Sequence, residues 1–197
     1  MKFKMTILLG ITILVLTGCV TTPLKMPPPS TLNITNINQH PYTAGLFVPQ
    51  SLKEYVYVKV TSPLDKMSFP LGEQTNEVFK KNMPLVFKNV VEINSITPGR
   101  DVDLIIKPSI IKFNSIIPQP AYKPYIATMI YHVDVYNKKG EKIYAQTSTG
   151  EAQTSKGLLS GFSARSICAE VAQMAMGNSV QQIVEGLSEA DELKNLK

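Results

Sequence analysis

The residues of this sequence best suited to acid–base or metal chemistry are His132 and Asp134. They lie two residues apart in a strand-like run, so both side chains are expected on the same face of that strand. A histidine held by a carboxylate could activate a serine, yet no Gly-x-Ser-x-Gly turn accompanies the pair. Zinc would need further nitrogen or sulfur ligands, and the second histidine, His40, lies in a linker-like stretch. We therefore predict a hydrogen-bonded surface histidine rather than a catalytic or metal site.

Two groups of acidic residues could act as paired carboxylates or bind a cation. Glu73 and Glu77 are four residues apart in a helical pattern, where they suit the polar side and the N-terminal end of a helix. Arg100, Asp101 and Asp103 follow a Pro-Gly turn, and an ion pair explains them better than a metal site. We predict no catalytic residue, no metal and no cofactor.

The two cysteines have different settings. Cys168 lies in an Ala- and Met-rich helical stretch, which favours a buried, inert thiol. Cys19 ends a segment with the parts of a secretory signal in order: Lys2 and Lys4, then an apolar run over residues 5–16, then small residues. That run is shorter than the roughly 20 residues of a transmembrane helix.

The segment Leu16-Thr17-Gly18-Cys19 resembles the lipobox of bacterial lipoproteins. The resemblance implies that residues 1–18 are removed and that Cys19 receives a diacylglycerol thioether and an N-acyl chain, which hold the protein on a membrane. Val20 follows, where an aspartate would retain a lipoprotein in the inner membrane under the enterobacterial sorting rule. The resemblance therefore implies the periplasm-facing side of the outer membrane. An ordinary signal peptide or an uncleaved anchor is the alternative.

Charge and length restrict the function further. The 197 residues carry a formal net charge of +5, with lysines scattered rather than clustered, so nucleic-acid binding is not predicted. The length fits one domain with its own core. We expect a lipidated N-terminus and Pro/Asn-rich tether over residues 19–43, one periplasmic domain over 44–187 and a fraying charged tail over 188–197.

The first expected strands cover residues 44–48 and 54–60 and are close enough in sequence for a hairpin. In the second strand, Val56, Val58 and Val60 alternate with tyrosine and lysine. The alternation predicts that the valines face the core and that the tyrosines are partly exposed.

The remaining pattern predicts two helices and a long hairpin. Pro108 interrupts a strand and indicates a sheet edge or a bulge there. Gly140 suits the turn of the hairpin. The expected elements are a helix over 74–87 ended by Pro84, strands over 90–93, 103–113, 125–136 and 141–152, and a final helix over 162–187. We predict an α+β two-layer sandwich, with a mostly antiparallel sheet of about five to six strands and two helices on one face.

Residues 102–109, residues 125–128 and the final helix with Asn178-Ser179 resemble YajG-like lipoproteins. The topology is also similar to the lipopolysaccharide-assembly lipoprotein and to auxiliary lipoproteins of lipid-transport systems. These families supply no catalytic residues. The resemblance implies a non-enzymatic, lipid-anchored accessory protein that binds an envelope-assembly or transport partner. A lipid or glycolipid carrier is the alternative, and it would need an apolar cavity between sheet and helices. No oligomeric state is predicted.

Two stretches are candidate partner surfaces. The loop over residues 115–124 carries apolar residues and three prolines without a core register, so it either contacts a partner or folds back on the sheet. The strand over 125–136 has a second face that mixes polar and apolar residues. The candidate contact residues are Ile116, Ile117, Tyr122, Ile126, Ile130 and Tyr136.

Overall fold

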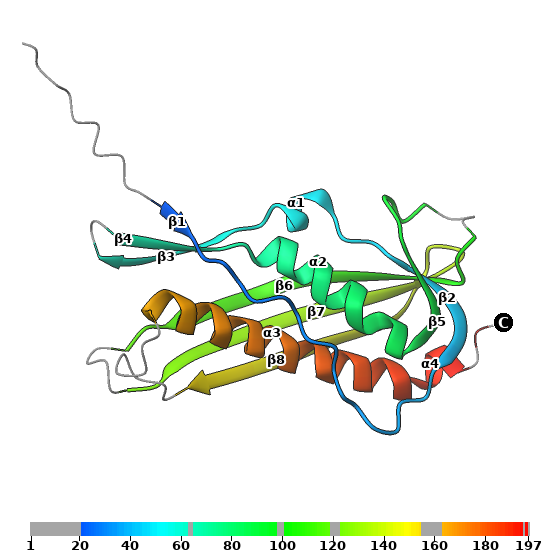
Figure 1. The fold of residues 1–197 in the computed structure, drawn as a ribbon. Helices are drawn as coiled ribbons and strands as arrows, with labels where there is room; N and C mark the ends of the chain where they lie inside the picture. Colours follow the sequence, from blue (N-terminus) through cyan, green and yellow to red (C-terminus); the bar gives the residue numbers. More distant parts are fainter. Residues whose placement is uncertain are drawn as a thin grey trace, which may run out of the picture.

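The fold is taken from a computed structural model, which describes residues 21–62, 65–97, 101–118, 123–154, 163–194 and 196 (Figure 1). Cys19 and Tyr122 lie outside the described residues. The elements are β1 (Thr21–Pro23), β2 (His40–Leu46), α1 (Gln50–Lys53), β3 (Tyr57–Ser62), β4 (Asp65–Phe69), α2 (Leu71–Asn82), the 3-10 helix η1 (Met83–Leu85), β5 (Phe87–Glu92), β6 (Leu104–Ile116), β7 (Tyr125–Asn137), β8 (Lys142–Thr154), α3 (Ala164–Glu189) and α4 (Asp191–Lys194).

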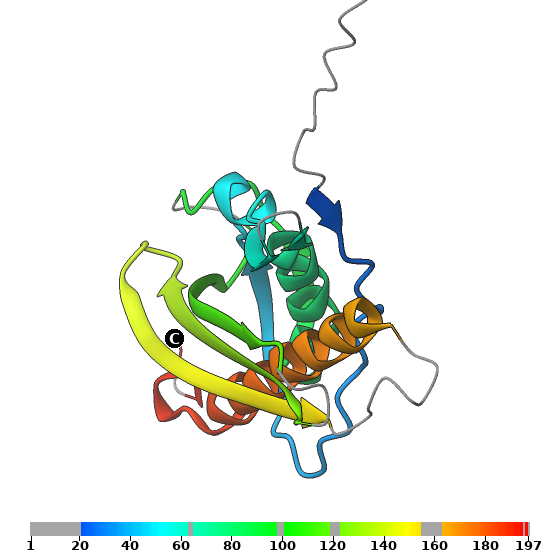
Figure 2. The same ribbon diagram turned by 90° about the vertical axis from the view of Figure 1, so that its left-hand side faces the viewer.

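The main sheet has the strand order β5-β2-β6-β7-β8 within the described residues. The long strands β6, β7 and β8 pair antiparallel, whereas β2 pairs parallel with both β5 and β6. Helices α2 and α3 cover one face of this curved sheet (Figure 2). The predicted α+β two-layer arrangement is confirmed. The parallel pairs at one side were not predicted, because they join strands that are far apart in sequence.

The core follows from the two-residue alternation of β7. Residues Ala127, Met129, Tyr131, Val133 and Val135 are at most 1% exposed, as predicted for this face. Tyr131 is packed edge-on against Phe79 of α2, with ring centroids 5.4 Å apart. The side chain of Thr75 donates to the Leu71 carbonyl oxygen at 2.7 Å, so the Tyr131 hydroxyl donates to the Thr75 oxygen at 2.8 Å.

Helix α3 lies very close to β8 because Gly150 has no side chain. A Cβ built on Gly150 would lie 2.1 Å from the Ala175 carbonyl oxygen and 2.3 Å from the Ser179 nitrogen. Beside this contact, the buried hydroxyls of Ser148 and Ser179 are hydrogen-bonded at 2.7 Å. Gly177, on the helix itself, has no atom within 4 Å of a built Cβ. The glycine that permits the contact is therefore on the strand.

The second sheet, with the order β1-β4-β3, corrects one prediction. Strand β3 pairs antiparallel with β4 rather than forming a hairpin with β2. The valines of β3 and the valine just before the strand face outward: Val56, Val58 and Val60 are 48%, 46% and 59% exposed. Tyr57 packs instead against Phe69 and Phe113, with centroids 5.9 and 5.0 Å away. Alternation gives the period of a strand, and here the larger aromatic ring fills the core.

Residues 23–43 do not form the predicted tether. Strand β1 pairs with β4, and Leu24 and Met26 are buried in the core at 4% and 8% exposure. The Leu32 backbone nitrogen donates a hydrogen bond to Asn82 Oδ1 at 2.8 Å, which attaches this part of the segment to the end of α2. Prolines hold this segment extended, and its apolar residues attach it along the helices (Figure 1). The prediction of a tether is wrong for residues 23–43 because the segment has enough apolar side chains to pack on the domain.

The C-terminal residues also pack on the domain. Helix α4 follows α3 directly, Leu193 is fully buried, and Leu196 packs against the core. The predicted frayed tail is therefore wrong for these residues. Pro84 lies in η1 just after α2, so the predicted stop of that helix is confirmed. No helix among the described residues is long and apolar enough to cross a membrane.

Candidate functional site

The His132 and Asp134 side chains share the open face of β7, as predicted. His132 Nε2 donates to Asp134 Oδ1 at 3.2 Å, and Nδ1 lies 2.9 Å from the Thr147 hydroxyl. Asp134 also pairs with Lys142 Nζ at 3.3 Å and accepts from the Tyr136 hydroxyl at 3.4 Å. Burial disfavours the carboxylate, but the hydrogen bonds from His132 and Lys142 outweigh it and hold the pKa of Asp134 below its ordinary value. The cluster is a hydrogen-bonded network that joins β7 to β8.

Of the other acidic candidates, Asp103 has structural partners, whereas Glu73 and Glu77 lie on the exposed side of a helix. Asp103 accepts from the Thr43 backbone nitrogen at 2.8 Å and pairs with Lys138 at 2.8 Å. The hydrogen bond from Lys138, followed by that from Thr43, lowers the pKa of Asp103. Glu73 and Glu77 are exposed on α2. Among the described residues, no group of three or more histidine, cysteine or acidic side chains could hold a metal ion.

Cys168 and His40 are buried structural residues. Cys168 is 2% exposed, and burial raises the pKa of its thiol to about 11. His40 is 5% exposed on β2, where its Nε2 donates to the Leu187 carbonyl oxygen near the end of α3 at 2.9 Å. Its ring stacks with Phe87 and Tyr42. Sequence alone placed His40 in a linker, and the histidine instead ties the first strand of the main sheet to the last long helix.

The predicted partner residues do not converge on one patch. Ile116 and Ile126 are direct neighbours across β6 and β7, and Ile116 is 47% exposed. Ile130 lies four residues further along β7. Tyr136 is packed at the other end of that strand, against the small cluster of Ile93, Val102 and Ile105. Ile117 packs against the main core. Of the predicted residues, Ile116, Ile126 and Ile130 lie on the open face of the sheet.

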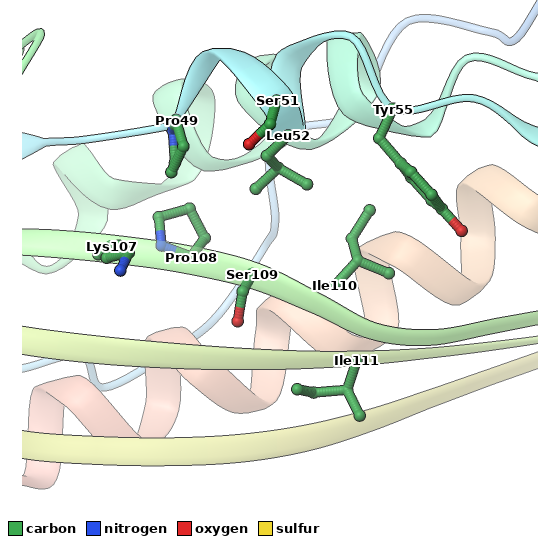
Figure 3. A pocket seen from close by; sticks show the side chains of 9 residues that line it. All are labelled: Pro49, Ser51, Leu52, Tyr55, Lys107, Pro108, Ser109, Ile110 and Ile111. Atoms are coloured by element: carbon green, nitrogen blue, oxygen red, sulfur yellow. The ribbon is translucent and has the colours of Figure 1, made fainter.

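A groove not predicted from the sequence lies along the edge of β6 (Figure 3). It has a volume of about 330 Å³. Leu52 and Tyr55 extend from the α1 segment toward β6, and residues 107–111 form the opposite wall. Ile111, at a shift of register in β6, is 61% exposed. We name the space between α1 and this part of β6 the edge groove. Its lining residues are Pro49, Ser51, Leu52, Tyr55, Lys107, Pro108, Ser109, Ile110 and Ile111.

The edge groove exists because β2 is shorter than β6. The pairing of β2 with β6 ends at Ile106, whose carbonyl oxygen accepts from the Phe47 nitrogen at 2.9 Å. Backbone polar groups alternate sides along a strand, so those of Pro108 and Ile110 point toward the same side as those of Ile106. No described strand pairs with β6 there. Pro108 has no N–H to leave unpaired on this side. The sequence predicted an edge or a bulge at Pro108; the described residues show the edge, and the shift of register in β6 lies further on, between Ile110 and Lys112.

Comparisons with known proteins show a shared fold. No protein-family model matches the sequence, and no curated protein matches it. The chain is similar to the crystal structure of a Xanthomonas campestris protein of the family DUF330, with a TM-score of 0.55, 11% identity, and coverage of 85% of this chain and 93% of the other.

Two lower similarities involve a putative lipoprotein from Caulobacter crescentus and a minor lipoprotein from Acinetobacter baumannii. The first has a TM-score of 0.37 and 11% identity and covers 47% of this chain and 69% of the other. The second has a TM-score of 0.42 and 10% identity and covers 74% and 90%. The comparisons therefore show that this chain and the Xanthomonas protein share a fold.

Proposed function

We propose that this protein is a lipid-anchored accessory lipoprotein of the bacterial envelope that binds a partner protein and catalyses no reaction. The observation that carries the anchor is the segment Leu16-Thr17-Gly18-Cys19 after a short apolar run. Acylation of Cys19 would hold the domain at a membrane surface. The outer membrane is the proposed location, because Val20 rather than aspartate follows Cys19.

The proposal of a binding protein is supported by the roles of the reactive side chains. His132 and Asp134 join two strands, His40 binds the end of α3, and Cys168 is buried in the core. Each group is engaged in holding the fold. The resemblance of residues 102–109 and of the final helix to YajG-like lipoproteins supports the same reading.

The edge groove is the proposed partner site, and its occupant is an extended segment of an envelope protein. A strand laid beside β6 would find the outward-facing backbone groups of Ile110 to pair with, and apolar contacts from Leu52 and Tyr55. Pro108 offers no donor, so pairing would be short and side-chain contacts would supply selectivity. Tyr131 and Met176 are fully buried between the sheet and helices α2 and α3, so the described residues do not support the apolar cavity that the alternative, a lipid carrier, would need.

Two measurements test this function. Intact-mass spectrometry of the protein purified from membranes should show a triacylated Cys19, and Cys19→Ser should release the protein from the membrane fraction. A photo-crosslinking amino acid at Leu52 or Tyr55 should capture a specific envelope protein in cells. The same group at Val91, an exposed valine on β5, is the matched control. Identical adducts from all three positions would contradict binding in the edge groove.

A further inference from the structure

The point at which the chain would leave the membrane is fixed by strand β1. Thr21, its first residue, is paired with Lys66 of β4. Two peptide units separate Thr21 from Cys19, and an extended chain spans at most about 7 Å over that length. A lipid on Cys19 would therefore be attached almost directly to the β1-β4-β3 sheet. The folding of residues 23–43 onto the domain removes the spacer that a free tether would supply.

Strand β3 of this sheet and the residue just before it carry three valines that we call the valine row: Val58 and Val60 lie in the strand, and Val56 directly precedes it. These side chains are about half exposed, at 48%, 46% and 59%. Val60 is paired with Lys66, which in turn is paired with Thr21, so the three positions form one row across the sheet. Directly paired residues project to the same face of a sheet, so the side chains of Val60 and Lys66 share one face, and Val58 lies on that face too because it is two residues from Val60. Figure 1 shows β1, β3 and β4 together at one end of the molecule, opposite the C-terminus.

The charges around the valine row suit a lipid surface. Lys66 lies on the same face, and Lys25 is exposed two residues after Pro23 of β1. The acidic residue at the start of β4, Asp65, forms an ion pair with Arg165 of α3. Apolar side chains flanked by lysines are the composition of interfacial membrane-binding surfaces, where the apolar part enters the headgroup region and the cations meet lipid phosphates.

We propose that the valine row docks into the lipid bilayer surface beside the anchor, so that the domain lies against the membrane rather than being held away from it. This inference rests on the proposed acylation of Cys19. The occupant of the face is the headgroup region of a bilayer that contains anionic lipid. The edge groove, on another element pair, remains available to a protein partner.

The docking is tested with a fluorophore on single cysteines in the acylated protein. Val58→Cys and Val60→Cys place the label in the valine row, and Val91→Cys is the control, because Val91 is an exposed valine (43%) on β5, toward the other end of the molecule (Figure 1). Cys168 is 2% exposed and is not expected to react with the fluorophore in the native protein. The protein is reconstituted into vesicles of phosphatidylethanolamine and phosphatidylglycerol in which the acyl chains carry bromine as a quencher.

The expected result is quenching at residues 58 and 60 at least about threefold greater than at residue 91. Val60→Glu should reduce quenching of the label at residue 58, whereas Val91→Glu should leave it unchanged.

Three outcomes would overturn the proposal, and they are distinguishable. Equal, weak quenching at all sites in protein with a mass-confirmed triacylated Cys19 refutes the docking and leaves the proposed anchor intact. Disulfide-linked dimers through Val58→Cys, without lipid quenching, assign the valine row to a second copy of the chain instead. An unmodified Cys19 in protein purified from membranes refutes the anchor and with it the docking, because the lipid on Cys19 is what places the valine row at the membrane.

Discussion

Replacing Gly150 by alanine is expected to force α3 away from the sheet. The added Cβ would lie 2.1 Å from the Ala175 carbonyl oxygen and 2.9 Å from the Ser179 Cα, both of which are helix backbone. Ordinary contact begins near 3.4 Å, so the helix must retreat by more than 1 Å along a row where its buried side chains meet β7 and β8. Overpacking of this kind costs about 1–3 kcal/mol, and a backbone clash belongs at the upper end of that range.

Gly177→Ala is the matched control with the opposite sign. Gly177 lies inside α3 with nothing within 4 Å of a built Cβ, so alanine removes the conformational penalty of a helical glycine at no steric cost. The expected gain is about 0.5–1 kcal/mol.

Urea denaturation followed by circular dichroism measures both changes. With a slope of about 2–3 kcal/mol per molar urea, Gly150→Ala should lower the midpoint by roughly 1 M, and Gly177→Ala should raise it by about 0.3 M. The slope itself should stay constant in both variants. If Gly150→Ala unfolded at the same urea concentration as the natural protein, the close contact between α3 and β8 would be wrong.

Three further predictions concern buried and paired groups. Thr75→Val leaves the buried Tyr131 hydroxyl without its acceptor and should lower the free energy of unfolding by about 1–3 kcal/mol. Tyr131→Phe should lower it by less, and in the double variant the penalty of the unpaired hydroxyl should disappear. Equal losses in the two single variants would contradict the assignment of Tyr131 as the donor. The Asp103 carboxylate stabilises the folded state at pH values above its pKa in the unfolded chain, near 3.8, and this contribution is lost as the pH falls through its lower pKa in the folded state. Asp103→Asn should therefore flatten the acid side of a plot of unfolding free energy against pH. Lys138→Gln should do so in part. The Cys168 thiol, with its pKa raised to about 11, should react with a disulfide reagent at least about 100-fold more slowly than a free cysteine at pH 8 until urea unfolds the chain; rapid native labelling would show that it is accessible.

The local parts of the fold could be predicted from the sequence because they are encoded by neighbouring residues. The alternation from Ala127 to Val135 marked the buried face of β7, and Gly140, with a φ of 80°, marked its turn. Pro108 marked an edge of β6. Each of these signals depends on a few consecutive side chains and on backbone limits that hold in any fold.

The errors concern which face is buried and which distant segments meet. The valine row has the same two-residue period whether it faces inward or outward. It faces outward because Tyr57, on the opposite face of β3, packs against Phe69 and Phe113 in the core. Residues 23–43 appeared suited to a linker because of their prolines and asparagines. Their sparse apolar residues pack instead against segments far along the chain, as the hydrogen bond between Leu32 and Asn82, 50 positions apart, shows. Pro108 indicated an edge or a bulge in β6, but the edge groove itself could not be predicted because it depends on the length of β2 relative to β6.

The central place of β2 has a consequence for the order of folding. This strand lies between β5 and β6, and neither partner is present until roughly half the chain has been added. Its first residue, His40, is hydrogen-bonded to the Leu187 carbonyl oxygen, so the loop of chain closed by that contact contains most of the protein. The β6-β7-β8 meander and α3 contain only near neighbours in sequence and can assemble first. If the chain crosses a membrane N-terminus first, β2 emerges long before β5 and β6 and has no strand to pair with until they follow. Pairing of β2 with β5 and β6 would then be the late, slow step of folding.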